Sequence, residues 1–83
     1  MTVPDWLAKR DGTLKPGVQP LMWFVLIGGL EYKVEARPAA GKFACAVQQS
    51  VNGRRLDDPK LTYPSADAAL AGGLDQLRAA LGW

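Results

Sequence analysis

The chain has 83 residues, of which 48% are hydrophobic and 22% are charged, with a formal net charge of +2. This composition excludes a disordered chain, and the length limits the protein to one domain with a single small core. With no histidine and one cysteine, Cys45, the chain forms neither an internal disulfide nor a Cys/His zinc site. We therefore expect no metal ion and a reducing compartment, by default the cytoplasm.

Residues 1–20 are expected to form an N-terminal arm, because prolines and glycines are too frequent there for a long element. Residues 4–10 are predicted to form a short helical turn that presents Trp6 and Leu7 as apolar anchors. The arm lacks the layout of a secretory signal, and Asp5 and Asp11 argue against a transit peptide.

From Leu21 the apolar pattern changes to a period of two, which is typical of strands. Turn signals at Gly28-Gly29, at Pro38 to Gly41 and at Asn52-Gly53 divide this part into four antiparallel strands, over 21–27, 30–37, 42–51 and 54–57. The uncharged run 21–30 is about half as long as the roughly 20 residues of a transmembrane helix. We therefore expect no membrane span.

A helix is predicted over 66–81, with Ser65 as its N-cap and Gly82 at the left-handed position after its end. Gly73 falls near the apolar stripe, so we expect it to let the helix approach the sheet, while Gly72 has no such explanation. The sequence thus predicts an α+β domain over 1–83: an antiparallel meander of about four strands (21–63), a C-terminal helix (65–82) on one face, and the arm on or near the other. Met1 and the capped helix just before Trp83 suggest a complete unit, and Trp83 is expected to tuck beside the sheet.

A two-residue Gly28-Gly29 turn fixes which side chains share a face, because opposed residues of an antiparallel pair point to the same side. The helix-covered face then receives Ile27 with Leu30, Val25 with Tyr32, and Trp23 with Val34. The opposite face receives Leu26 with Glu31, Phe24 with Lys33, and Met22 with Glu35.

The length of the loop at Pro38 to Gly41 decides the orientation of the next strand. A four-residue loop brings Phe43, Cys45 and Val47 to the core, and the Asn52-Gly53 turn then adds Val51 and Leu56. A five-residue loop would turn Phe43, Cys45 and Val47 outward.

Three apolar side chains, Met22, Phe24 and Leu26, are therefore left on the face away from the helix. Trp6 and Leu7 of the arm could cover them and close a three-layer domain. Alternatively strand 21–27, at a sheet edge, pairs with its symmetry mate in a homodimer, or a different protein supplies the cover. The last two alternatives make Met22, Phe24 and Leu26 a protein interface.

The best basic grouping is Arg54 and Arg55 after the Asn-Gly turn, with Lys42 and Arg37 at the neighbouring turn. The register places Arg55 opposite Ser50 on the open side of the sheet, near Gln48 and Lys33. The alternative nucleic-acid site is therefore Lys33, Lys42, Arg54 and Arg55. In element order, residues 21–81 resemble plant ethylene-response-type DNA-binding domains and phage integrase arm-binding domains. Those families lay a sheet face into the major groove, so the resemblance implies weak nucleic-acid binding as an alternative; it assigns no residue a role.

No pattern indicates catalysis or a cofactor. Cys45, between alanines, is expected to be a buried core residue and not a nucleophile. Asp57 and Asp58, which could join Glu31 and Glu35 in a carboxylate group, are expected to form a turn before Pro59. We therefore expect a non-catalytic protein-binding or self-assembly module.

Overall fold

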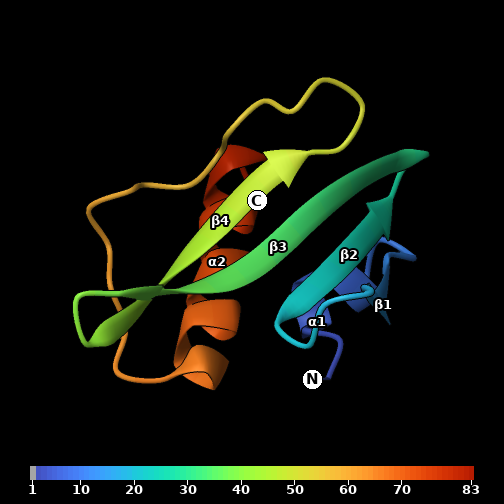
Figure 1. Cartoon of the computed structure of the whole chain (residues 1–83). Helices are drawn as coiled ribbons and strands as arrows, with labels where there is room; N and C mark the ends of the chain where they lie inside the picture. The colour runs from blue at the N-terminus through green and yellow to red at the C-terminus, as the bar shows by residue number, and fades with distance from the viewer. Residues whose placement is uncertain (1) are drawn as a thin grey trace.

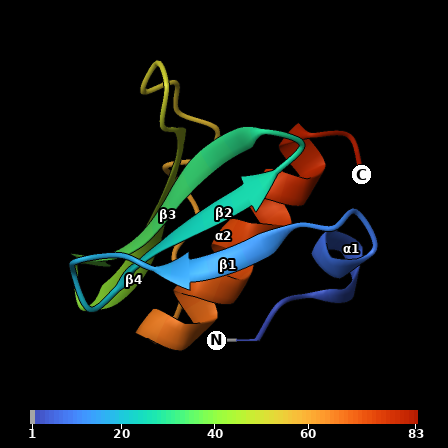
Figure 2. The ribbon, with the colours of Figure 1, turned by 90° about the vertical axis from the view of Figure 1, so that its right-hand side faces the viewer.

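A four-stranded antiparallel sheet with the strand order β1-β2-β3-β4 forms the centre of the molecule (Figure 1). The computed structural model describes residues 2–83. In chain order, its elements are α1 (Asp5–Ala8), β1 (Thr13–Pro16), β2 (Met22–Ile27), β3 (Leu30–Ala39), β4 (Lys42–Gln49) and α2 (Ala66–Ala80). Helix α2 packs across one face of the sheet, and neither helix lies over the other face (Figures 1 and 2). The predicted α+β meander with a C-terminal helix is confirmed.

The fourth strand differs from the predicted one. β1 lies within the expected arm and pairs with β2, with Thr13 opposite Leu26 and Lys15 opposite Phe24. The segment 54–57, predicted as a strand, forms only a single bridge between Arg55 and Gln48. It does not continue as a ladder because the Asp57 side chain, not a main-chain carbonyl, accepts the hydrogen bond from the Val47 N–H (2.9 Å).

The predicted β2–β3 register is confirmed in all six pairs from Ile27 with Leu30 to Met22 with Glu35. Gly28 and Gly29 have φ of 58° and 79°, the left-handed values that a tight two-residue hairpin turn requires. Val25 and Val34 are fully buried, whereas Leu30 at the hairpin end is 44% exposed. The prediction that Leu30 belongs to the core is wrong: its partner Ile27 is buried, but Leu30, the first residue after the turn, is not covered.

The β3–β4 turn has two residues, since Ala39 pairs with Lys42. A two-residue and a four-residue loop have the same parity, so Cys45 and Val47 point into the core as expected, and the five-residue alternative is wrong. Phe43 is half-buried against the core. Leu56 also packs against it.

Val51 is 81% exposed, so its predicted place in the core is wrong. It lies in the turn that follows β4, beyond the part of the sheet that α2 covers. We call the irregular segment 50–64, which leads from β4 to α2, the strap.

Helix α2 begins as predicted, with Ser65 Oγ accepting a hydrogen bond from the Ala68 N–H (3.1 Å). Two glycines in its middle bring it close to its neighbours. A Cβ at Gly73 would overlap Cys45 Sγ, and a Cβ at Gly72 would overlap the ring of Tyr63 in the strap. Gly73 therefore permits the close approach to the sheet, and Gly72 the approach of the strap.

The arm packs on the helix side of the sheet. Leu7 is fully buried in the core cluster, and the rings of Trp6 and Trp83 lie 6.1 Å apart. The Arg10 guanidinium lies 4.3 Å from the Trp83 ring centroid. The expectation that Trp6 and Leu7 cover the opposite face is therefore wrong, and Trp83 tucks against α1 and not against the sheet. Across residues 2–83, no helix has the length and apolar character that a membrane crossing requires.

Candidate functional site

The face of the sheet turned away from α2 is the candidate site, and we call it the open face. Because side chains alternate along each strand, the pairing register assigns its members. They are Thr13 and Lys15 of β1; Met22, Phe24 and Leu26 of β2; Glu31, Lys33, Glu35 and Arg37 of β3; and Ala44, Ala46 and Gln48 of β4. Figure 1 looks onto this face, with α2 behind the strands.

An apolar stripe runs along β2. Met22, Phe24 and Leu26 are each half-buried, and each lies beside a charged residue of β3. On its other side, Phe24 is flanked by Lys15, whose Nζ lies 5.9 Å from the ring centroid. The stripe is thus shielded laterally by long polar side chains but is not covered by another element.

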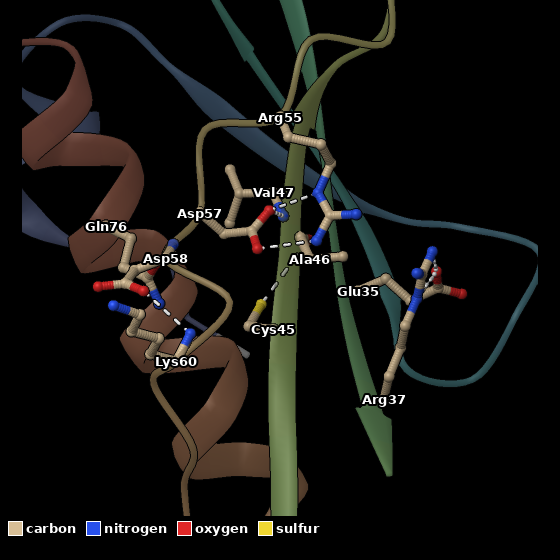
Figure 3. Close-up of polar contacts among 10 residues, drawn as sticks. All are labelled: Glu35, Arg37, Cys45, Ala46, Val47, Arg55, Asp57, Asp58, Lys60 and Gln76. Atoms are coloured by element: carbon tan, nitrogen blue, oxygen red, sulfur yellow. Dashed lines mark hydrogen bonds and ion pairs between the residues drawn. The ribbon is translucent and has the colours of Figure 1, made fainter. Parts of the chain in front are cut away.

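The charges on β3 alternate in sign along the strand, in the order Glu31, Lys33, Glu35, Arg37. Arg37 donates two hydrogen bonds to Glu35 Oε1, from Nε at 3.0 Å and from Nη2 at 2.9 Å (Figure 3). Half of the Arg37 side chain is exposed, so this pair contributes about 0–1 kcal/mol to stability. The ion pairs found within residues 2–83 include neither Glu31 nor Lys33.

A second ion pair anchors the strap beside β4. Arg55 Nε donates to Asp57 Oδ1 at 2.6 Å and its Nη2 to Oδ2 at 2.8 Å, while Asp57 Oδ1 also accepts the Val47 N–H (Figure 3). The Asp57 side chain is only 2% exposed. The hydrogen bonds from Arg55 and Val47 hold the pKa of Asp57 below its ordinary value, and Asp57 raises the pKa of Arg55. Arg55 is therefore already bound by a carboxylate of its own chain.

The four basic residues of the predicted nucleic-acid site are only partly brought together. Lys33 and Arg55 lie in one transverse row of the open face, on either side of Gln48. Lys42 lies six residues from Gln48 along β4, about 20 Å at the rise of a strand. The main-chain carbonyl of Arg54 accepts a hydrogen bond from the Gln49 N–H (2.9 Å), and Arg54 does not belong to the row.

The row contains a basic residue that sequence reasoning missed. Lys15 of β1 lies opposite Phe24, so the complete row is Lys15, Phe24, Lys33, Gln48 and Arg55. The only signal was the alternation of Thr13, Leu14 and Lys15, in which only Leu14 packs against the core, and four residues are too few for it to stand out.

Both edges of the sheet are protected. Along β4, the strap takes up main-chain groups: Phe43 exchanges two hydrogen bonds with Tyr63 (2.9 and 2.7 Å), and Val47 accepts one from the Leu56 N–H (2.8 Å). At the other edge, β1 is four residues long and ends in Pro16, which lacks an N–H. Strand 21–27 is interior, as β2, so the alternative in which this strand lies at an edge and pairs with its symmetry mate is wrong.

The reactive groups considered from the sequence have structural roles. Burial raises the pKa of the Cys45 thiol to about 11, which makes it a poor nucleophile at neutral pH. Asp58 Oδ1 accepts the Lys60 N–H (2.9 Å), which is the expected turn, and the Asp58 N–H donates to Gln76 Oε1 (2.6 Å; Figure 3). In the part of the chain that the structure describes, no three acidic or cysteine side chains group as metal ligands would.

A groove of about 360 Å³ lies on the helix side, between the start of β2 and the first turns of α2. It is lined by Pro20, Leu21, Trp23, Asp67, Leu70 and Ala71. Its lining has a single charged group and no convergent set of polar side chains, so it offers no chemistry for catalysis.

Comparison with known proteins identifies no matching family model, and no curated protein or solved structure is significantly similar to the chain. The architectural resemblance to two families of DNA-binding domains therefore gains no support from relatives.

Proposed function

We propose that this protein is a non-catalytic interaction module that binds a protein partner through its open face. The observation that carries the proposal is the apolar stripe of Met22, Phe24 and Leu26 on a sheet face that neither helix covers. The cytoplasmic location expected from the sequence is part of this proposal.

The composition of the open face supports binding of a protein. Aromatic and methionine side chains are typical anchors at the centre of protein interfaces, and charged side chains are typical of their rims. Here Phe24 and Met22 are adjacent on one strand face, with Lys15 on one side and the β3 charges on the other. Since both sheet edges are protected, the face and not an edge is the surface available to a partner.

The size of the face indicates a modest affinity. Strands about 4.8 Å apart and a rise of about 3.3 Å per residue give the open face a footprint of roughly 400–500 Å². This is at the low end of specific interfaces, so the complex is expected to be reversible.

Site-specific photo-cross-linking in cells that produce the protein at its natural level tests the proposal. A photoreactive phenylalanine analogue at Phe24 or Leu26 is expected to form protein adducts. The control is the same analogue at Leu61, an exposed apolar residue of the strap. Absence of adducts from both open-face positions, or equal yields from Leu61, would contradict the proposal.

The transverse row supports a second candidate, weak binding of single-stranded nucleic acid. A base stacked on Phe24 would lie between the cations Lys15 and Lys33. Glu31 and Glu35 on either side of Lys33, and the bond of Arg55 to Asp57, act against this function. If it holds, affinity for a mixed-sequence oligonucleotide falls with salt and is weakened by Lys33→Ala but not by Lys42→Ala. Binding that Lys33→Ala leaves unchanged would contradict it.

A further inference from the structure

We infer that the partner is a second copy of this chain, with the two open faces packed together. The two copies are related by a two-fold axis that lies between the faces, perpendicular to the strands, and crosses β3 between Lys33 and Glu35. This inference rests on the proposed function and names the occupant of the same surface. It is carried by the order of charges on β3.

The β3 charges are complementary to themselves when one copy of the strand is reversed. Read forward, the signs are minus, plus, minus, plus at Glu31, Lys33, Glu35 and Arg37. A two-fold axis between Lys33 and Glu35 places Lys33 over Glu35 of the partner subunit, and Glu31 over Arg37 of the partner subunit. Because the interface is isologous, each contact occurs twice, giving four pairs of opposite charge.

The same axis also brings together Met22 and Phe24 of the apolar stripe. Phe24 lies in the row of Lys33, and Met22 lies in the row of Glu35. The rotation therefore places Phe24 over Met22 of the partner subunit, a thioether–aromatic contact of the kind proteins favour. β4 contributes Ala44, Ala46 and Gln48, of which Ala46 is already buried, and Arg55 of the strap borders the open face beyond Gln48.

Two other two-fold arrangements of the faces are worse. An axis through the row of Lys33 places Lys33 over Lys33 of the partner subunit and Glu31 over Glu35 of the partner subunit. Both contacts bring like charges together. An axis parallel to the strands, between β2 and β3, places Glu31 over Leu26 and Glu35 over Met22 of the partner subunit. That arrangement would desolvate carboxylates against apolar groups without compensation.

Arg37 can serve both the monomer and the dimer. Its side chain is half exposed although it already binds Glu35. A guanidinium has five donors, so it can keep Glu35 and also reach Glu31 of the partner subunit. The charge pairs then select the orientation of the two copies, and the apolar stripe provides most of the affinity.

Charge exchange tests the inference by sedimentation equilibrium over a range of protein concentrations. Wild-type protein is expected to dimerise. Lys33→Glu and Glu35→Lys are each expected to weaken dimerisation at least tenfold, because each juxtaposes two pairs of like charge. The double variant K33E/E35K is expected to recover it, and an equimolar mixture of the two single variants should form heterodimers.

The controls are Lys9→Glu and Asp75→Lys, which make the same charge changes at exposed positions away from the open face. Both are expected to dimerise like wild type. Circular dichroism and thermal melts establish that each variant is folded, and heterodimer formation by the mixed single variants is itself a result that a folding defect cannot produce.

The outcomes separate this inference from the proposed function. A wild-type chain that stays monomeric at every concentration overturns the inference, while a cross-link from Phe24 to a different protein leaves the proposed function standing. A dimer that the charge exchange neither weakens nor restores overturns the inferred axis. Adducts with nucleic acid and none with protein overturn both.

Discussion

The two faces of the sheet are built from the same strands but use their side chains in opposite ways. On the face under α2, Val25, Val34 and Val47 are fully buried, and each full burial of this kind stabilises the fold by about 1.5–3 kcal/mol. On the open face, every apolar residue of β2 is half-buried and lies beside a charge. The face under α2, which we call the closed face, therefore supplies the stability of the domain. The open face is left free to serve recognition.

Matched leucine substitutions test this comparison most strongly. Leu77→Ala removes a fully buried side chain of α2 and is expected to lower the free energy of unfolding by about 2–5 kcal/mol. Leu26→Ala makes the same chemical change on the open face, where about 1 kcal/mol or less is expected. Urea unfolding at a concentration where the chain is monomeric gives both values. Equal losses would mean that the open face belongs to the core.

Asp57→Asn tests whether the Asp57 carboxylate secures the strap along the edge of β4. The variant keeps the shape but loses the charge that binds Arg55, so a loss of about 1–3 kcal/mol is expected. Because the folded-state pKa of Asp57 lies below the ordinary value of 3.8, its stabilising effect is complete above that value and is lost as the pH falls below it.

Stability measured between about pH 5 and pH 2 checks this sign. The fall in stability at acid pH should be smaller in Asp57→Asn than in wild type. Asp75→Asn, an exposed position on α2, is the matched control and should retain the wild-type slope. A wild-type slope in Asp57→Asn would show that the ion pair does not secure the strap.

Gly73→Ala tests how closely α2 packs on the closed face, and the smallest effect is expected here. The new Cβ would overlap Cys45 Sγ, an overpacking cost of about 1–3 kcal/mol, offset by about 1 kcal/mol of helix propensity. Adding Cys45→Ala removes the sulfur, so the alanine should then be close to neutral. A double-mutant cycle by thermal unfolding measures the coupling. An additive result would mean that the helix is not held against Cys45.

Parity explains why the sequence predicted the faces better than the elements. The Gly28-Gly29 turn admits one register, which places Met22, Phe24 and Leu26 on the open face. The next loop is two residues shorter than expected, yet the faces agree because only odd changes in length invert a strand. Tertiary contacts decided where the strands begin and end and on which side the arm packs.

The missed and the over-predicted strands have separate physical causes. β1 has four residues and ends at Pro16, too short for a period of two to stand out, and Lys15 was missed with it. The segment 54–57 alternates like a strand, but the Asp57 carboxylate replaces a main-chain partner there. Trp6 and Leu7 signalled burial correctly; no local pattern states which face of a sheet an arm will choose.

The position of Trp83 has a practical consequence. Trp83 contacts Trp6, and Arg78 Nε of α2 donates to the Trp83 carbonyl oxygen (2.9 Å), so Trp83 is held on the helix side. A tether attached at Trp83 would leave Phe24 facing outward. The fold is thus suited to display: attached at Trp83 to a solid support, it keeps the opposite surface accessible.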